Sequence, residues 1–149
     1  MKRSRALMSL SHDHHAALFV AQQLRRTTSA TATDARRAFL AYWAEHGSAH
    51  FRIEEEVLLP AYAAHGDPYH PMVARTLCDH VAIRHRAAAL QSDHVADVEA
   101  LRELGVALAA HVRHEERELF GLIERAIPAA ELSALAERLR PARCGPPDG

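Results

Sequence analysis

The sequence has few residues of several kinds, and each scarcity excludes a class of protein. Lysine occurs once, at Lys2, and the formal net charge is -1, so a broad basic surface for nucleic acid is not expected. Two cysteines, Cys78 and Cys144, are too few for a disulfide framework and indicate reduced thiols. No uncharged run approaches the roughly 18 residues that a membrane helix needs, and no signal-peptide core follows the basic start. We therefore expect a soluble, cytoplasmic protein.

What remains is a helix-forming chain with one anomaly. Its 149 residues are 48% hydrophobic, which suits one domain with a buried core. Alanine is abundant and β-branched residues are few, which favours helix throughout. The anomaly is the presence of 12 histidines. Histidine is the commonest metal ligand and a frequent catalytic group, so their placement along the chain matters.

Turn signals divide the chain into four long helical stretches. The predicted ranges are about Ser9–Thr28, from a cap at Thr33 or Asp34 to about Ala64, from the Gly66–Pro71 turn to about Gln91, and about Ala96–Ala126. Pro60 is expected to kink the second helix or end its regular part. Leu132, Leu135 and Leu139 predict a short fifth helix.

Short links make neighbouring helices antiparallel. The predicted fold class is therefore all-α, an antiparallel up-down-up-down four-helix bundle with a short C-terminal fifth helix. We expect a single domain over residues 1–140 and a disordered tail over residues 141–149.

The second and fourth helices carry the same pattern, His-x-Arg-x-Glu-Glu-x-x-Leu, beginning at His50 and at His111. Positions i and i+4 of a helix differ by only about 40° in direction, so each histidine shares a face with a glutamate. In the first copy this glutamate is Glu54. In the second copy His114 and Glu118 form an overlapping pair, but the internal match favours His111 and Glu115.

The first and third helices each add a histidine on an apolar stripe. His14 follows Leu10, and His80 shares its predicted stripe with Leu77, Val81 and Arg84. On the second helix the predicted stripe runs through Trp43, His46, His50 and Glu54. Counted from the nearest breaks, His14, His50, His80 and His111 lie at similar depths in the bundle, so we expect them to converge.

The order His14, His50-x-x-x-Glu54, His80, His111-x-x-x-Glu115 resembles the hemerythrin-like (HHE cation-binding) family, over about Ser9 to Ala126. The resemblance implies a non-haem di-iron centre inside the bundle. It implies histidines as terminal ligands, His14, His50, His80 and His111, and carboxylates as bridges, Glu54 and Glu115. Zinc or manganese would also suit these donors.

One departure from the family bears on function. Oxygen-carrying hemerythrins have a second histidine on the third helix where this chain has Arg84, and His85 is turned away by about 100°. They also use an aspartate where this chain offers Glu115. A missing histidine leaves one iron less saturated, which favours redox chemistry or sensing over reversible carriage. Two roles for Arg84 stay open, a positive charge beside bound peroxide or a partner of a ligand carboxylate.

The expected function is to bind or reduce oxygen or peroxide, or to sense oxygen, iron or redox state, with dioxygen, peroxide or nitric oxide as small ligands. The alternatives are non-catalytic iron storage or buffering and a zinc-stabilised interaction module. Some histidines near breaks or on outer faces are expected to have no metal role, namely His12, His15, His65, His70 and His94. Others stay open as extra ligands or outer partners, namely His46, His85 and His114, together with Glu118.

Overall fold

The computed structural model describes residues 3–93 and 97–144, with side chains up to residue 139, and all regular secondary structure in this part of the chain is helical. The all-α fold class is therefore confirmed. In chain order the elements are α1 (Arg5–Arg25), α2 (Ala32–Tyr42), the π-helical turn η1 (Trp43–Gly47), α3 (Ser48–Ile53), the π-helical turn η2 (Glu54–Leu58), α4 (Leu59–Ala63), α5 (Pro71–Ser92), α6 (Val98–His114), the π-helical turn η3 (Glu115–Leu119), α7 (Phe120–Ala126) and α8 (Ala129–Cys144). Within these residues, every helix is too short or too polar to cross a lipid bilayer.

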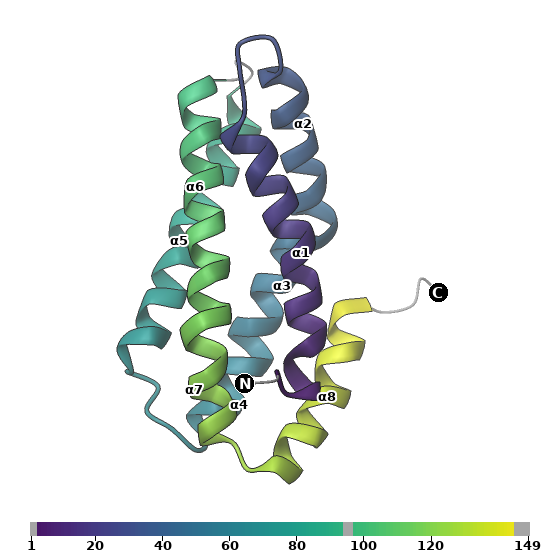
Figure 1. Cartoon of the computed structure of the whole chain (residues 1–149), viewed down its shortest axis with the longest axis vertical. Coiled ribbons are helices and arrows are strands. Elements are labelled where there is room, and N and C mark those ends of the chain that lie inside the picture. The colour runs from purple at the N-terminus through teal and green to yellow at the C-terminus, as the bar shows by residue number, and fades with distance from the viewer. Residues whose placement is uncertain (1–2, 94–96, 145–149) are drawn as a thin grey trace.

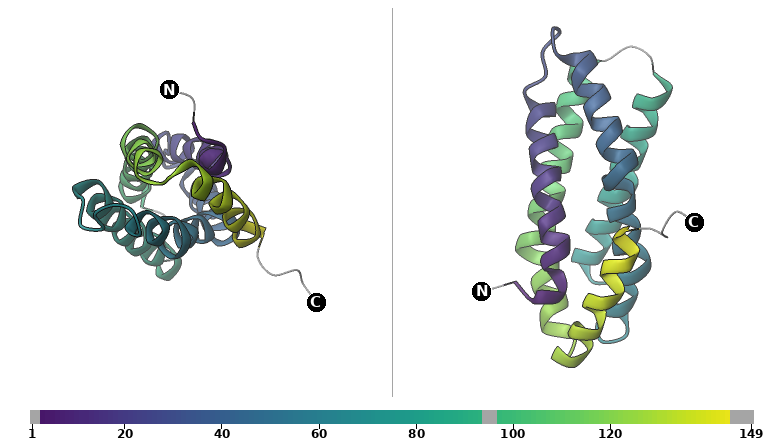
Figure 2. Two further views of the ribbon diagram at one scale, coloured as in Figure 1. Left: turned by 90° about the horizontal axis from the view of Figure 1, so that it is seen from below. Right: turned by 90° about the vertical axis from the view of Figure 1, so that its right-hand side faces the viewer.

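These elements join into four long helices with a fifth beside them. The backbone stays helical from α2 to α4, which form the second long helix, and from α6 to α7, which form the fourth. Figure 1 shows the chain rising along α1, descending along the second long helix, rising along α5 and descending along the fourth. Figure 2 shows α8 crossing one side, where it contacts α1 and α3. This course is compatible with the predicted bundle and its fifth helix.

Local signals in the sequence set several helix ends. The His70 side chain caps α5 by accepting a hydrogen bond from the backbone N–H of Met72 at 3.1 Å. Pro71 follows at the first helical position, where no N–H donor is needed. The Asp97 carboxylate caps α6 through backbone N–H groups of its first turn. Both helices begin close to where the turn signals place them.

Two other ends differ from the prediction. α1 begins at Arg5, earlier than the predicted Ser9. α8 extends to Cys144, whereas the tail was expected from residue 141 onward. Pro141 therefore lies within the helix and not at its end. Residues 145–149 of the predicted tail lie outside the described residues.

Two of the π-helical turns begin at glutamates that the repeated motif contains. η2 starts at Glu54 and η3 starts at Glu115. A π-helical turn holds one residue more than an α-helical turn, and such turns are frequent at functional sites. Pro60 is the second residue of α4, which follows η2, and the helix continues past it to Ala63. Pro60 therefore does not end the second long helix, but the regular α-helix is interrupted just before it.

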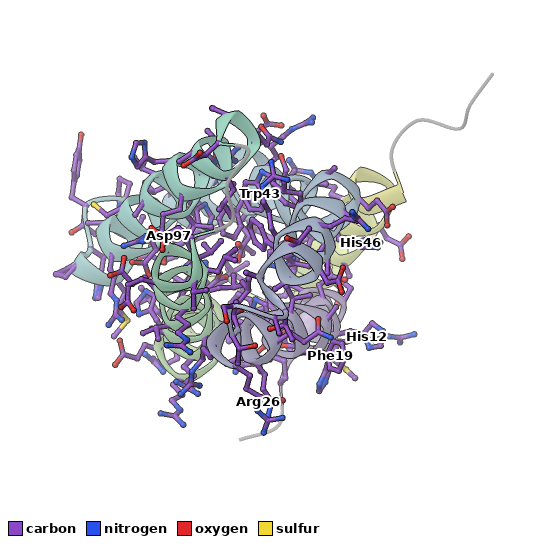
Figure 3. The ribbon with its side chains drawn as sticks, turned by 90° about the horizontal axis from the view of Figure 1, so that it is seen from above. His12, Phe19, Arg26, Trp43, His46 and Asp97 are labelled. Atoms are coloured by element: carbon purple, nitrogen blue, oxygen red, sulfur yellow. The ribbon has the colours of Figure 1, made fainter. Side chains whose placement is uncertain are left out.

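The buried stripe of the second long helix differs from the prediction at His46. The His46 side chain is 70% exposed, and Figure 3 shows it at the periphery while Trp43 lies toward the interior. Gly47 faces inward instead, because a Cβ there would lie 2.8 Å from the Trp43 ring. The π-helical turn that spans these residues changes the register that a regular helix would give.

The buried stripe of α5 also differs. Leu77 and Val81 are exposed, and the face that contains His80 includes Thr76 and Ile83 instead. Because Thr76 is polar, a hydropathy pattern does not identify this face as buried. Burial of the Thr76 hydroxyl costs little, because the hydroxyl donates to the backbone oxygen of Met72 at 2.9 Å.

The apolar core forms two clusters along the bundle. The lower cluster of Figure 1 contains Leu7, Leu10, Leu58, Tyr62, Leu119, Phe120 and Ile123, and the upper cluster contains Ala21, Leu24, Phe39, Trp43, Ile83, Leu101 and Leu104. Along α1, His14 falls between Leu10 of the lower cluster and Ala21 of the upper one. The sequence-predicted site residues therefore form a polar layer between two hydrophobic ones.

The contact between α1 and α6 generates a prediction at Gly105. A Cβ there would lie 2.7 Å from the backbone oxygen of Ala21 and 2.8 Å from the Cβ of Leu24. Gly105→Ala is expected to lower the free energy of unfolding by about 1–3 kcal/mol, because the backbone of α1 would have to move. Chemical denaturation measures the loss.

Gly121→Ala is the matched control for this prediction. Its Cβ would meet the flexible end of Arg125 at 3.2 Å. Because alanine favours helix over glycine, stability is expected to stay level or rise by up to about 1 kcal/mol. Equal denaturation midpoints for Gly105→Ala and the wild type would contradict the steric argument.

Candidate metal centre

The six residues of the predicted site come from all four long helices and are buried. α1 contributes one and α5 another, and each motif-bearing helix contributes two: His14 from α1, His50 and Glu54 from the second long helix, His80 from α5, and His111 and Glu115 from the fourth. Their exposed fractions range from 0% for both glutamates to 7% for His50. The structure therefore brings together every residue that the sequence pattern predicted to converge.

These side chains form two overlapping groups able to hold a metal ion. One group contains His14, His50, Glu54 and Glu115, and the other contains Glu54, His80, His111 and Glu115. Within each group the potential ligand atoms all lie within 4.8 Å of one another. Each group has its own two histidines, and both groups share both glutamates.

Each glutamate faces one histidine from each group. Glu54 Oε1 lies 3.4 Å from His50 Nε2 and 3.3 Å from His80 Nε2. Glu115 Oε2 lies 3.8 Å from His14 Nε2, and its other oxygen contacts His111 Nε2. Glu54 thus faces both groups through one oxygen and Glu115 through both of its oxygens, so each carboxylate lies between the two groups.

The inward-facing atoms of the site have no other partners. Among the described residues, the Nε2 atoms of all four histidines and all four oxygens of Glu54 and Glu115 are buried without a hydrogen-bond partner. Burying unsatisfied polar and charged groups is costly unless they are paired or coordinate a metal. The donor set therefore fits a pair of cations, which would satisfy these atoms together.

A carboxylate fixes the outward face of each histidine. The four Nδ1 pairs are His14 with Glu116 at 2.6 Å, His50 with Asp13 at 3.1 Å, His80 with Glu55 at 2.7 Å and His111 with Asp79 at 3.1 Å. When Nδ1–H donates to the carboxylate, the lone pair is left on Nε2, which faces the interior. All four rings are thus oriented for coordination through Nε2.

Sequence reasoning missed these four outer carboxylates, although the sequence contains a signal for them. Asp13-His14 and Asp79-His80 repeat the same dipeptide on α1 and α5, and Glu55 and Glu116 are the second glutamates of the two motifs. Each carboxylate contacts a histidine on a neighbouring helix. The repetition was visible, but the pairing depends on how the helices are rotated against each other.

Arg84 lies outside the ring of ligand atoms. Its guanidinium donates to Glu55 at 3.0 Å and lies over the Phe51 ring, which is stacked on His80 with ring centres 3.8 Å apart. Its carboxylate partner is thus the one that orients His80, rather than Glu54. Arg84 therefore pairs with a carboxylate that orients a candidate ligand, and not with a carboxylate of the two groups.

Arg3 repeats this arrangement on the other side of the site. It donates to Glu116 at 3.3 Å and lies over Phe120, whose ring is stacked on His14. Glu116 in turn orients His14. His14 and His80 are therefore held in the same way. Each ring stacks on a phenylalanine and pairs with a glutamate, and an arginine contacts both the phenylalanine and the glutamate.

Charge interactions inside the site shift the pKa values of its members. Burial alone would lower the pKa of His50, but the Glu54 carboxylate and the hydrogen bond to Asp13 raise it to about 9. Burial alone would raise the pKa of Glu54, but His50 and His80 hold it well below its usual range. Without a metal ion, the positive charge of protonated His50 therefore partly balances the negative charge of Glu54.

The remaining histidines lie outside the two groups. His46 and His85 are exposed. His114 is buried, but its Nε2 donates to the backbone oxygen of Met72 at 3.0 Å, and its Nδ1 pairs with Glu118. The side chain of Glu118 is 51% exposed. These four residues, which the sequence left open, are thus not placed with the ligand atoms.

The histidines expected to have no metal role are also outside the groups where the structure describes them. His12 and His15 are exposed on α1, His65 contacts Glu131, and His70 caps α5. His94 lies outside the described residues.

A small cavity lies directly against the two groups. Its volume is about 10 Å³, which suits a single water-sized ligand. His14, His50, His111 and Glu115 line it on the polar side. The rest of the wall contains the polar residues Asp13 and Tyr42 and the apolar residues Ala17, Phe51, Leu108 and Val112. The structure therefore has a water-sized space directly beside ligand atoms of both groups, with polar and apolar residues in its wall.

Comparison with known proteins identifies one family. The family model described as the hemerythrin HHE cation binding domain matches residues 6–123. No curated protein and no solved structure matches the chain. The matched range contains all six candidate ligands and their four outer carboxylates.

The outer carboxylates generate a prediction at Glu55. Glu55→Ala is expected to weaken metal affinity by about 10- to 100-fold, because His80 loses the partner that orients its ring. Competition with a chelator of known affinity measures the effect. Glu56→Ala is the matched control, since Glu56 is the next residue but its side chain is 68% exposed. Equal affinities for the two variants would contradict the orienting role.

The raised pKa of His50 generates a second prediction. Because a metal ion must displace the His50 proton, apparent affinity is expected to rise with pH and to level off above pH 9. Below pH 9, the loss of the His50 proton raises the apparent metal affinity by up to about tenfold per pH unit. Asp13→Asn removes one cause of the raised pKa, so the rise should shift to lower pH. A competition titration that is flat between pH 7 and 9 would refute this.

Proposed function

The chain belongs to the hemerythrin HHE cation-binding family, and we propose on this basis that its two buried groups hold a pair of iron ions that react with dioxygen or peroxide. In this proposal His14 and His50 bind one ion and His80 and His111 bind the other. Glu54 and Glu115 bridge the two. We also propose a cytoplasmic location, which the scarcity of cysteine supports.

The observation that carries the proposal is that both groups share both glutamates. Two separate sites would each need their own carboxylates, whereas shared carboxylates support a site for two cations side by side. Metal ions about 3.5–4 Å apart can act together on one small ligand. Histidine and carboxylate donors suit iron, and the family favours iron over zinc or manganese.

The number of ligands supports reaction with a small molecule. Two imidazoles and one oxygen from each glutamate give each ion four protein ligands. Non-haem iron sites of histidine and carboxylate keep open positions for oxygen chemistry. The small cavity beside His14, His50 and His111 offers room at these positions. Arg84, in place of a further histidine, contacts Glu55 and adds no ligand.

The protein's own residues prepare the site for this chemistry. Asp13, Glu55, Asp79 and Glu116 orient the four imidazoles. Phe51, Leu108 and Val112 form the apolar part of the cavity wall beside the small ligand. When bound, a pair of iron ions would supply the electrons and the coordination positions. We therefore propose redox chemistry or sensing with dioxygen, peroxide or nitric oxide as ligands, in preference to reversible oxygen carriage.

Metal analysis combined with optical spectroscopy tests the proposal. The protein is purified without oxygen, its metals are counted, and oxygen, peroxide or nitric oxide is then added. Two iron ions per chain and a new absorption band after addition are expected. Fewer than one metal ion per chain contradicts the proposal. Bound iron that does not respond indicates storage, and zinc recovered from native expression indicates a zinc-stabilised module.

Substitution of Glu115 provides a separate prediction. Glu115→Ala is expected to reduce bound metal from two ions to one or none, because both cation positions lose a shared ligand. Glu118→Ala is the matched control on the same helical turn, since its half-exposed side chain contacts His114. Elemental analysis of the two variants gives the result. Full metal content in Glu115→Ala would rule out the bridging role.

A further inference from the structure

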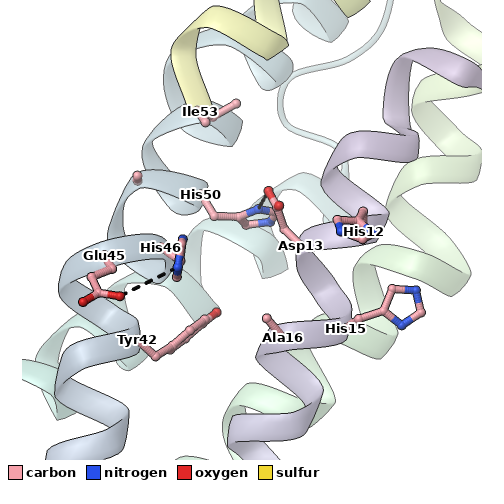
Figure 4. A pocket seen from close by; sticks show the side chains of 10 residues that line it. His12, Asp13, His15, Ala16, Tyr42, Glu45, His46, His50 and Ile53 are labelled. Atoms are coloured by element: carbon pink, nitrogen blue, oxygen red, sulfur yellow. Dashed lines mark hydrogen bonds and ion pairs between the residues drawn. The ribbon is translucent and has the colours of Figure 1, made fainter. Parts of the chain in front are cut away.

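A surface groove of about 450 Å³ opens beside the metal centre. Its walls are α1 on one side and the second long helix on the other (Figure 4). Asp13 and Ala16 line it from α1, and Tyr42, His46 and His50 line it from the opposite wall. The groove is therefore a solvent-filled depression that reaches one of the candidate metal ligands.

Three residues join this groove to the interior of the site. Asp13, Tyr42 and His50 line both the groove and the small cavity beside the ligand atoms. His50 is 7% exposed, whereas His14, His80 and His111 are 1–3% exposed. Its Nδ1 pairs with Asp13, and its Nε2 faces Glu54 without a hydrogen bond. His50 is thus the ligand through which the site comes closest to solvent.

The chemistry of the groove suits a cation. Asp13 and Glu45 contribute carboxylates, and none of the described residues that line it is arginine or lysine, although the sequence has 18 of these. His46 lies 3.9 Å from Glu45 and, in Figure 4, stands between Glu45 and His50, whereas the His15 ring points away. Imidazole and carboxylate groups therefore follow one another from the mouth of the groove to the site.

We propose that this groove is the entry route for a divalent transition-metal cation. Glu45 and His46 capture the ion at the mouth, and it passes to Asp13 and His50 before it reaches the shared glutamates. A negatively charged cleft raises the local concentration of cations and their association rate. The inference rests on the proposed metal centre and adds how that centre is loaded.

The rate of metal loading tests this route. Metal-free protein is mixed rapidly with Co²⁺, whose optical bands report coordination, and both rate and final stoichiometry are measured. Glu45→Gln combined with His46→Ala is expected to slow loading about tenfold, because capture at the mouth is lost. The final stoichiometry should stay at two ions per chain. His85→Ala, an exposed histidine on α5, is the control and should load at the wild-type rate.

A second variant tests the route without removing a polar group. Ala16→Phe places a ring in the groove and is expected to slow loading with unchanged stoichiometry. Ala82→Phe is the matched control, because Ala82 is likewise an exposed helical alanine but lies on α5.

The outcomes separate this inference from the proposed function. Wild-type loading rates in both groove variants, with two ions bound, would overturn the entry route and leave the metal centre intact. Loss of an ion from the double variant at equilibrium would also overturn it, since Glu45 and His46 would then be permanent ligands. Less than one ion in the wild type would overturn the metal centre and the route together.

Discussion

The structure depends on what offsets the free-energy cost of burying a layer of imidazoles and carboxylates inside an apolar bundle. Eight inward-facing atoms from His14, His50, His80, His111, Glu54 and Glu115 lack hydrogen-bond partners among the described residues. Hydrophobic clusters lie above and below them, so the layer cannot move to solvent without opening the bundle. A ligand that binds the folded state alone adds its binding free energy to stability. Metal binding and folding are therefore coupled in this chain, and the core can be completed only by a bound cation or by protonation.

The site is built twice from the same parts. Each half of the chain supplies an Asp-His pair, at Asp13-His14 and Asp79-His80, and a His-x-x-x-Glu-Glu segment. Each aspartate orients the motif histidine of its own half, whereas each second glutamate orients a histidine of the other half. Because the halves hold each other's ligands, neither can form its cation position alone. The groove breaks this equivalence, since it reaches the site at His50.

Much of this arrangement could be predicted from the sequence, because helical spacing is rigid. The interval between His50 and Glu54 fixes both on one face, and the repeat at His111 indicated a shared site. Two kinds of feature could not be predicted. The outer carboxylates depend on the rotation of neighbouring helices, which no local pattern encodes. The exposure of His46 depends on a π-helical turn, and the buried Thr76 depends on a hydrogen bond to a backbone oxygen.

The π-helical turns also bear on how the length of this chain can vary. η2 and η3 each hold one residue more than an α-helical turn, and residues at their ends and beyond them pack into the lower cluster. Because a π-helical turn accommodates its extra residue locally, loss of that residue would restore a regular α-helical turn and leave the rest of the helix facing nearly the same way. Loss of a residue from an α-helical stretch would instead rotate the remainder by about 100° and turn residues such as Leu58 or Phe120 away from the core. The long helices can therefore change in length at these turns more readily than in the α-helical stretches that flank them.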